Sequence, residues 1–324
     1  SEMCIRDRDH INYTHLRIDL SDKEAIEKAF DYYKPHQVVN LAAQAGVQYS
    51  LVNPHEYISS NIRGFLNILE LGKRQKIKHL LYASSSSVYG LNKKIPFSEH
   101  DNVDHPLNIY AASKKSNELM AHSYSYLYDL PTTGLRFFTV YGPWGRPDMA
   151  LFIFTKAALR NKTIKVNNNG NHSRDFTYVD DIVSGISNVI PLQPKRNEYL
   201  ESKPFESEAP WRILNIGRGQ KVQLMEFIEI IEEYFGKEIK KEFVPLQVGD
   251  VADTYSDTTR LKENYNYDPK ITVKEGVIRF LDWYVEYLSL IHISEPTRPE
   301  RIWYSVLCLK KKRGGGGGGG GGGG

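Results

Sequence analysis

Short apolar runs alternate with longer amphipathic segments through the first part of the chain. The runs are rich in Leu, Val, Ile and aromatic residues and lie at His15–Ile18, Gln37–Leu41, His79–Ala83 and Thr133–Phe137. Runs of this length between polar residues predict β-strands. Because the segments that separate them have the character of helices, the order predicts an α/β fold with a parallel, doubly wound (Rossmann-type) sheet.

Three helices are predicted between these strands. Ser21 and Glu24 have the spacing of a capping box and begin the first helix. Asn53-Pro54 opens the second, since proline is tolerated in a first turn, and that helix runs to about Lys73. The third extends from about Asn108 to Tyr128.

After residue 141 the pattern becomes less regular. Pro143, Gly145 and Pro147 interrupt the chain, and a turn is expected over residues 167–170. A strand at Arg212–Ile216 precedes a helix with one apolar face, formed by Leu224, Phe227, Ile228, Ile231 and Phe235. We therefore predict that residues 9–141 carry the sheet and that residues 142–287 mainly form a smaller, mixed α/β domain for a substrate.

The two ends differ from the body of the chain. Residues 1–8 and 288–324 resemble translated sequencing read-through, ending in an unbroken glycine run from Gly314 to Gly324, and we expect both to be artefacts. The alternative is an unusual flexible tail. From Ser289 onward bases exceed acids by four, so a net charge of +3 for the chain becomes about −1 for the rest.

Charge and composition exclude several kinds of protein. A body near neutrality offers no basic surface for nucleic acid or for an anionic membrane. No apolar run approaches the roughly 18 to 20 residues that span a bilayer, and nothing resembles a signal peptide, so a cytoplasmic location is expected. Both cysteines, Cys4 and Cys308, lie in the suspect ends, and no histidine or carboxylate cluster has metal spacing.

Tyr110 and Lys114 are the first candidates for chemistry. Four residues span about one helical turn, so the phenol and the ammonium share a helix face. A neighbouring cation lowers the pKa of a tyrosine, which a base working near neutral pH requires. Tyr89 with Lys93 and Tyr199 with Lys203 repeat the spacing, but prolines and a glycine stand against helices there. A solvated helix surface is the other interpretation.

Two loops that follow predicted strands add candidates. Residues 84–87 are four serines directly after a strand, where ligands bind in open α/β sheets, although such runs are also common in turns. Residues 136–149 read Arg-Phe-Phe-Thr-Val-Tyr-Gly-Pro-Trp-Gly-Arg-Pro-Asp-Met, with Arg174 downstream. Arginines there suit a diphosphate or a carboxylate, or ion pairs with Asp148 or Asp175.

Taken together, the serine loop, the Tyr-x-x-x-Lys helix and the Arg-Phe-Phe-Thr-Val-Tyr-Gly stretch resemble the extended short-chain dehydrogenase/reductase family, and most closely its bacterial UDP-glucuronate 4-epimerases. The resemblance covers about residues 11–287. It implies that Tyr110 is the catalytic base, Lys114 its partner and Ser85 the hydroxyl that binds the sugar oxygen at carbon 4.

The resemblance also implies the binding residues. It places Asp19 and Leu20 at the adenine of NAD, and it lines the rest of the dinucleotide with Leu41, Ala42, Ala43, Gln44 and Asn61, beside Tyr110 and Lys114. For the UDP-sugar it implies Ser85, Ser86, Thr139, Arg146, Arg174 and Asp250, with Arg174 at the diphosphate. The helices over residues 53–73 and 108–128 resemble those that form a four-helix homodimer interface in this family.

The activity that the resemblance implies is epimerisation at carbon 4 of a UDP-sugar without a metal, most directly from UDP-glucuronate to UDP-galacturonate for polysaccharide precursors. UDP-hexose and UDP-N-acetylhexosamine epimerases are alternatives. Dehydratases and decarboxylases of this fold typically carry an acidic residue where Ser86 and Ser87 stand, which favours an epimerase. An inert fragment is the remaining alternative.

One departure from the family is clear in the sequence. The chain contains no Gly-x-x-Gly-x-x-Gly turn, the motif that holds the pyrophosphate at a helix amino end. The strand at residue 15 then corresponds to strand 3 of the fold, so the sheet is expected to lack its first two strands and to leave the strands at residues 15 and 37 with unpaired edges. On this interpretation the chain as written is truncated, poorly soluble, free of NAD and inactive.

Overall fold

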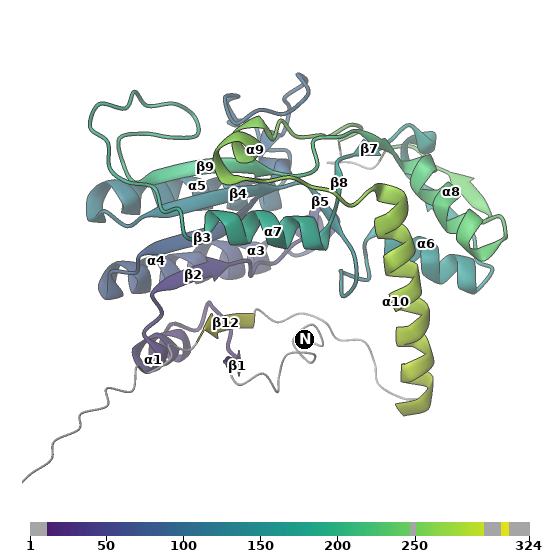
Figure 1. The fold of residues 1–324 in the computed structure, drawn as a ribbon, viewed down its shortest axis with the longest axis horizontal. Helices are drawn as coiled ribbons and strands as arrows, with labels where there is room; N and C mark the ends of the chain where they lie inside the picture. The colour runs from purple at the N-terminus through teal and green to yellow at the C-terminus, as the bar shows by residue number, and fades with distance from the viewer. Residues whose placement is uncertain (1–11, 247–250, 295–305, 311–324) are drawn as a thin grey trace, which may run out of the picture.

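Four parallel strands form the central sheet of the computed structural model, which describes residues 12–246, 251–294 and 306–310 (Figure 1). Their order across the sheet is β2 (Gln37–Asn40), β3 (His79–Ser85), β4 (Thr132–Phe137) and β9 (Trp211–Ile216). The register pairs Val38 with Leu80 and Leu80 with Thr132. The parallel sheet expected from the alternation of strands and helices is confirmed.

Helices cover both faces of this sheet because successive strand residues point to opposite sides. On β3, Leu80 and Tyr82 pack into one core, while Leu81 packs into another. The first core is closed by α1 (Lys23–Tyr33), α4 (Gly64–Gln75) and α5 (Ile109–Tyr128), and the second by α7 (Val179–Val189) and α9 (Thr259–Tyr265). The sheet is therefore doubly wound.

The helix starts follow local side-chain chemistry. Asn108 caps α5, since its Oδ1 accepts a hydrogen bond from the backbone N of Ala111 at 2.9 Å. Pro54 opens α3 (Pro54–Tyr57), which continues through a π-helical segment, η2 (Ile58–Arg63), into α4. The capping box at Ser21 and Glu24 was wrong: Asp22 caps α1 by accepting from Ala25 N at 3.1 Å.

The strand predicted near residue 15 forms, but outside the central sheet. β1 (Tyr13–Arg17) pairs antiparallel with β12 (Val306–Lys310), a segment of the tail that was expected to be an artefact. One edge of β1 is therefore paired, with a partner that an apolar run cannot specify, and within the described residues its other edge stays unpaired. Within the described residues, β2 pairs with β3 alone.

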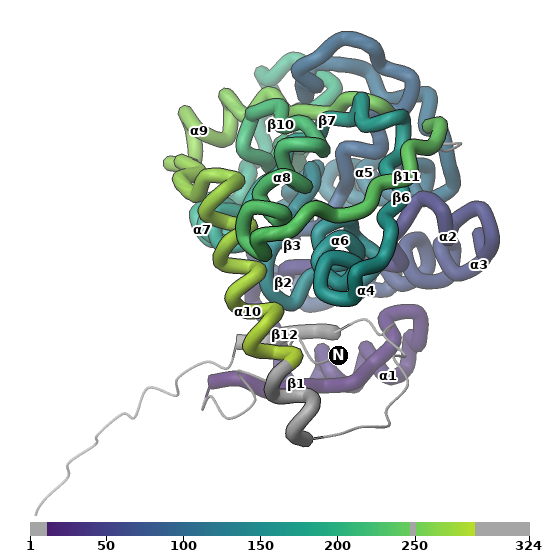
Figure 2. Tube along the Cα trace, turned by 90° about the vertical axis from the view of Figure 1, so that its right-hand side faces the viewer, coloured from purple at the N-terminus to yellow at the C-terminus, as the bar shows by residue number. Residues whose placement is uncertain are grey.

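A third core lies beside the sheet and is built mainly by α6 (Ala150–Leu159), α8 (Leu224–Phe235) and α10 (Val273–Ser294) (Figure 2). The predicted apolar face of α8 is buried there. Short pairs complete this region: β5 (Thr139–Tyr141) with β8 (Phe176–Tyr178), β6 (Ile164–Val166) with β11 (Lys241–Phe243), and β7 (Ser173–Arg174) with β10 (Val222–Gln223). The strand predicted at residues 212–216 was assigned to this region, but as β9 it belongs to the central sheet.

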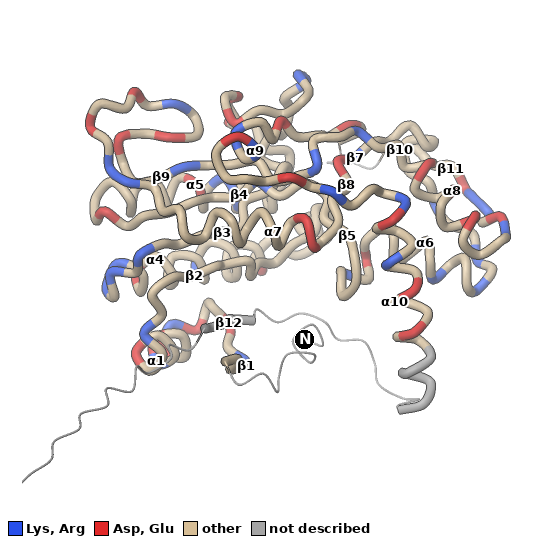
Figure 3. Tube along the Cα trace, viewed as in Figure 1, with Lys and Arg blue, Asp and Glu red and all other residues tan. Residues whose placement is uncertain are grey.

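Basic and acidic residues are interspersed along the described chain (Figure 3). In the part of the chain that the structure describes, none of the helices is both long enough and apolar enough to cross a bilayer. The same residues contain no group of three or more His, Cys, Asp or Glu side chains arranged to hold a metal ion.

Candidate active site

The carboxyl ends of β2, β3 and β4 meet at one edge of the sheet, because the three strands are parallel neighbours. The segment after β2 carries Leu41 to Gln44, β3 ends at Ser85, and β4 is followed by Thr139 in β5. The serine loop continues as η3 (Ser86–Tyr89), where Ser85 Oγ accepts from Ser87 N at 3.2 Å. Ligand-facing residues predicted from distant parts of the sequence therefore lie along one edge.

Tyr110 and Lys114 face this edge from α5, which packs on β3. The Nζ of the buried Lys114 donates to the carbonyl of Ala83 at 2.8 Å, and burial lowers the pKa of this lysine to about 8. Burial raises the pKa of Tyr110, while a hydrogen bond with Ser85 and the charge of Arg146 oppose this. The structure thus brings Ser85, Tyr110 and Lys114 together.

Lys114 was expected to lower the pKa of the Tyr110 phenol, and this effect stays a prediction. In the structure burial raises that pKa, against the hydrogen bond with Ser85 and the charge of Arg146. The cation that acts on Tyr110 is Arg146, which also opposes a rise in the pKa of Tyr57 to about 12 caused by burial.

Asn61 fastens the segment after β2 to α5. Its Oδ1 accepts from Gln44 N at 2.8 Å, and its Nδ2 donates to Gln44 O at 3.0 Å and to Ser113 Oγ at 2.9 Å. Ser113 Oγ in turn donates to the carbonyl of Tyr110 at 2.8 Å. Asn61 was predicted to line the dinucleotide. Its side chain holds the backbone of Gln44, a residue that was also predicted to line it.

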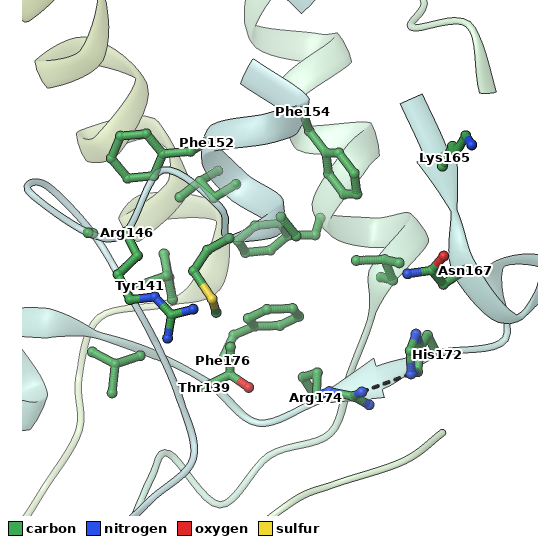
Figure 4. Close-up of a pocket in the computed structure, with 18 residues that line it drawn as sticks. Thr139, Tyr141, Arg146, Phe152, Phe154, Lys165, Asn167, His172, Arg174 and Phe176 are labelled. Carbon is green, nitrogen blue, oxygen red and sulfur yellow. Dashed lines mark hydrogen bonds between the residues drawn. The ribbon is translucent and has the colours of Figure 1, made fainter. Parts of the chain in front are cut away.

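A cavity of about 240 Å³ opens between the end of β4 and the third core (Figure 4). Thr139, Arg146 and Arg174, all predicted for the substrate, line it. Figure 4 shows the rings of Phe152 and Phe154 on one side of the cavity and Thr139, Arg174 and His172 opposite them. Ser86 is half-buried in η3 and is not part of this lining, and Asp250 lies outside the described residues.

The arginines near this cavity have different partners. Arg146 pairs with Asp148 through Nε at 3.0 Å and Nη2 at 2.5 Å. Arg174 Nη1 donates to the carbonyls of Ser173 and Ala252, both at 2.9 Å, and its Nη2 lies 2.8 Å from His172 Nε2. The ion pair with Asp148, left open by the sequence, is present.

Asp175 and Arg136 serve the framework. The carboxylate of the buried Asp175 accepts from Arg218 N at 2.8 Å, Gly219 N at 3.0 Å and Ser256 N at 3.0 Å. Arg136 is fully buried and pairs with Glu118 at 2.9 and 3.0 Å, so it is removed from the candidates for a diphosphate.

Several residues of the site were not anticipated. Glu118 follows Lys114 by one more turn of α5, a spacing that was visible in the sequence and could have been found. Tyr57, whose hydroxyl donates to Gly46 O at 2.6 Å, carries no motif that marks it. His172 lies two residues before the predicted Arg174 but was not itself predicted. Their positions depend on chain segments that meet only in the folded protein.

The site fits the half of NAD that would lie beside Lys114 better than the adenine half. Within the described residues the ammonium of Lys114 donates one of its three N–H groups to the carbonyl of Ala83, and the other two suit the hydroxyls of a ribose. On the adenine side Leu20 is buried in the core, and the carboxylate of the exposed Asp19 accepts from Ser21. Leu41 is half exposed beyond β2, and a glycine-rich pyrophosphate turn is absent from the sequence.

A doubly wound sheet with a Tyr-x-x-x-Lys helix against the strand that ends in Ser85 defines an enzyme of the short-chain dehydrogenase/reductase class. The chain belongs to the NAD dependent epimerase/dehydratase family, whose sequence model matches residues 2–199. NAD as the cofactor of this class and the Rossmann-type fold are thereby confirmed.

Named relatives are similar over most of the chain. It is 54% identical to protein CapI of Staphylococcus aureus over 85% of this chain and 84% of that protein. It is 46% identical to a probable UDP-glucuronate 4-epimerase of Rhizobium meliloti, over 85% and 82%. A crystal structure of UDP-glucuronic acid 4-epimerase from Bacillus cereus with UDP-glucuronic acid and NAD superimposes with a TM-score of 0.71 at 28% identity, over 83% and 79%.

Proposed function

We propose that the chain is an NAD-dependent UDP-sugar 4-epimerase whose substrate is UDP-glucuronate. The observation that carries the proposal is the meeting of Ser85, Tyr110 and Lys114 at the sheet edge, next to a cavity lined by Arg146 and Arg174. The relatives named as UDP-glucuronate 4-epimerases support the substrate.

The charge of the cavity supports an acidic substrate. Among its described lining residues, Arg146, Lys165 and Arg174 are basic and none is acidic. A UDP-uronate carries negative charge on both the diphosphate and the sugar carboxylate, and guanidinium groups bind both by paired hydrogen bonds. An uncharged UDP-hexose would use only part of this set.

In the proposed mechanism, Ser85 forms a hydrogen bond with the oxygen at carbon 4 and Tyr110 removes the hydroxyl proton. NAD, when bound, would supply the hydride acceptor and donor for carbon 4. Lys114 would hold the ribose beside Tyr110 through the N–H donors left by Ala83. After the 4-keto sugar has rotated to present its opposite face, Tyr110 returns the proton. The reaction therefore consumes no oxidant.

Product analysis with several substrates tests this function. The purified chain, with NAD supplied in excess, is incubated with UDP-glucuronate, UDP-glucose and UDP-N-acetylglucosamine, and the products are separated by anion exchange. We expect UDP-galacturonate as the principal product, in place of the inactivity that the missing glycine-rich turn led the sequence to predict. No conversion of any of the three sugars would reject the function. A UDP-pentose would indicate a decarboxylase, a 4-keto-6-deoxy sugar a dehydratase, and conversion of the neutral sugars alone would reject the substrate.

We also infer a homodimer formed by the helical path over residues 54–75 and by α5. The two helices α4 and α5 are neighbours, and Leu66, Leu119 and Leu127 on them are 40%, 57% and 64% exposed. Apolar side chains gathered on adjacent helices suit a protein interface. Light scattering should give twice the chain mass, and Leu119→Lys should give a monomer; a wild-type monomer at micromolar concentration would contradict this.

A role in polysaccharide precursor synthesis in the cytoplasm is part of the proposal and rests on the resemblance.

A further inference from the structure

An aromatic clamp joins the loop that carries Arg146 to the C-terminal helix α10. The clamp consists of Trp144, Trp283 and Tyr287. Ring centroids of Trp144 lie 5.1 Å from Trp283 and 5.3 Å from Tyr287, and Trp283 and Tyr287 stack at 5.2 Å with 16° between their planes. Aromatic pairs at such distances attract one another beyond the area they bury.

The backbone of this loop is held in a costly conformation. Trp144 has φ of 62°, in the left-handed region that disfavours a residue with a Cβ. Gly142 has φ of 144°, and a Cβ there would lie 2.7 Å from Val179 Cγ1. Such conformations persist only where the surroundings over-determine them, and the contacts of Trp144 with α10 provide that restraint.

The restrained loop ends at the reacting groups. Two residues after Trp144, Arg146 reaches across the site: a Cβ at Gly46 would lie 3.2 Å from its Nη2. Its charge acts on both Tyr57 and Tyr110. The loop therefore spans the distance between α10 and the catalytic tyrosine.

The cavity wall belongs to the same assembly. Phe152, which lines the cavity, has its ring centroid 6.0 Å from that of Trp283 and 4.8 Å from that of Phe280. Arg146 and Phe152 thus both take their positions from one face of α10.

We propose that the clamp of Trp144, Trp283 and Tyr287 makes α10 a positioning element for substrate binding, because it fixes the loop that aims Arg146 into the UDP-sugar site. This inference rests on the proposed function. It assigns to Trp144, Trp283 and Tyr287 a role that depends on Arg146 and that none of the three performs by touching the substrate.

Calorimetric binding of UDP-glucuronate tests the clamp without requiring turnover. The three variants are Trp144→Asn, Trp283→Leu and Arg146→Gln. Asparagine removes the ring but tolerates the left-handed conformation, and leucine preserves apolar bulk. We expect each to weaken binding about tenfold, the scale of a lost charge-assisted hydrogen bond. Trp144→Phe, which retains an aromatic ring, should bind UDP-glucuronate within about threefold of the wild-type affinity.

A double variant separates positioning from general damage. Trp144→Asn combined with Arg146→Gln should bind no more weakly than Arg146→Gln alone, since Trp144 acts through the arginine. Tyr234→Leu is the matched control. The ring of Tyr234 lies outside the clamp, but its hydroxyl donates to Asp282 of α10 at 2.7 Å. This variant should bind UDP-glucuronate like wild type.

The outcomes distinguish this inference from the proposed function. Wild type that binds no UDP-glucuronate would reject both. Wild-type binding that Arg146→Gln weakens, while Trp144→Asn and Trp283→Leu leave it unchanged, would reject the clamp alone. Additive losses in the double variant, or an equal loss with Tyr234→Leu, would show that α10 merely supports the fold and would also overturn the proposal.

Discussion

Burial drives the two central ionisable side chains toward their neutral forms. It raises the pKa of Tyr110 and lowers that of Lys114 to about 8. Near pH 8, therefore, about half of the lysine would be uncharged. Ser85 and Arg146 are the two groups that favour the phenolate, the form that Tyr110 needs in order to accept a proton in the proposed mechanism.

Replacement of Tyr110 by phenylalanine should remove most of the epimerisation while leaving UDP-sugar affinity nearly intact. The phenol transfers a proton, a contribution typically worth 10² to 10⁴ in rate, and adds little to ground-state binding. Steady-state kinetics and calorimetry measure the two effects separately. Tyr126→Phe, on the exposed side of α5, is the control. Near-normal turnover of Tyr110→Phe would remove the tyrosine from its assigned role.

Thr139 is expected to hold the sugar carboxylate. The sugar oxidised at carbon 4 is a β-keto acid, which loses carbon dioxide unless its carboxylate is kept from the reactive geometry. Thr139 lines the cavity, and its backbone N donates to the carbonyl of Asp175 at 3.1 Å, which fixes its position. We propose that its hydroxyl binds the carboxylate; Ser86, which was predicted to share this role, lies outside the cavity lining.

Thr139→Val should accordingly release some UDP-pentose alongside the epimer, detected by chromatography of the reaction products. Thr139→Ser retains the hydroxyl and should release none. A valine variant that loses activity without forming any pentose would assign Thr139 to another task.

At the scale of elements, a buried ion pair docks α5 onto the sheet. Glu118 on α5 accepts from Arg136 on β4 and, at 2.6 Å, from Ser84 Oγ on β3. Arg136 also lies 4.9 Å from the ring of Tyr89, whose hydroxyl donates to Asn215 of β9 at 2.7 Å. One network therefore relates the helix of Tyr110 to three strands.

Arg136→Met should lower the free energy of unfolding by about 3 to 5 kcal/mol, because it leaves the carboxylate of Glu118 buried without its partner. The double variant Arg136→Met/Glu118→Leu should regain more than half of that loss, since no unpaired charge then remains. Urea denaturation measures both. Losses that simply add would show that the pair is not coupled.

The sequence predicted individual elements better than their partners. Asn108 and Pro54 begin helices where their side chains satisfy or avoid backbone donors, a local effect that is legible in a single chain. The pairing of β1 with β12 and the place of β9 in the sheet depend on contacts between distant residues. Neither has a local sequence signal.

At the scale of the whole molecule, His79 makes stability depend on pH. The ring is fully buried, with Nδ1 2.9 Å from Ile190 O and Nε2 2.9 Å from Thr133 Oγ1, and burial lowers its pKa from 6.5 to about 4. The folded state thus favours neutral histidine. The resulting stability is complete above the unfolded pKa near 6.5 and is lost as pH falls toward 4.

We expect the unfolding free energy to fall by up to about 1.4 kcal/mol per pH unit below pH 6.5, as measured by urea titrations at pH 7.0, 6.0 and 5.0. The difference between wild type and His79→Gln isolates this contribution from that of Glu99, whose pKa is raised by burial and which acts in the opposite direction. Parallel pH profiles for the two proteins would contradict it.

The site was only partly predictable at this scale. The Tyr110–Lys114 spacing and the resemblance predicted the residues that we propose as the centre of the site. That Arg146 would act on Tyr110 while Arg136 would pair with Glu118 could not be inferred, because the two arginines occupy the same motif and only the fold separates a buried strand position from a loop.

The π-helical segment η2 sets the rotational phase between the two halves of one helix. Tyr57 before it is buried against the carbonyls of Ala45 and Gly46, whereas Phe65 and Ile68 after it are buried in the sheet core. A wide turn absorbs an extra residue, and each residue of an α-helix advances it by about 100°. Deleting a residue such as Ser59 would restore a regular helix and swing Tyr57 off its loop while the core residues kept their places. The backbone after β2 would then lose the alignment that a single inserted residue maintains.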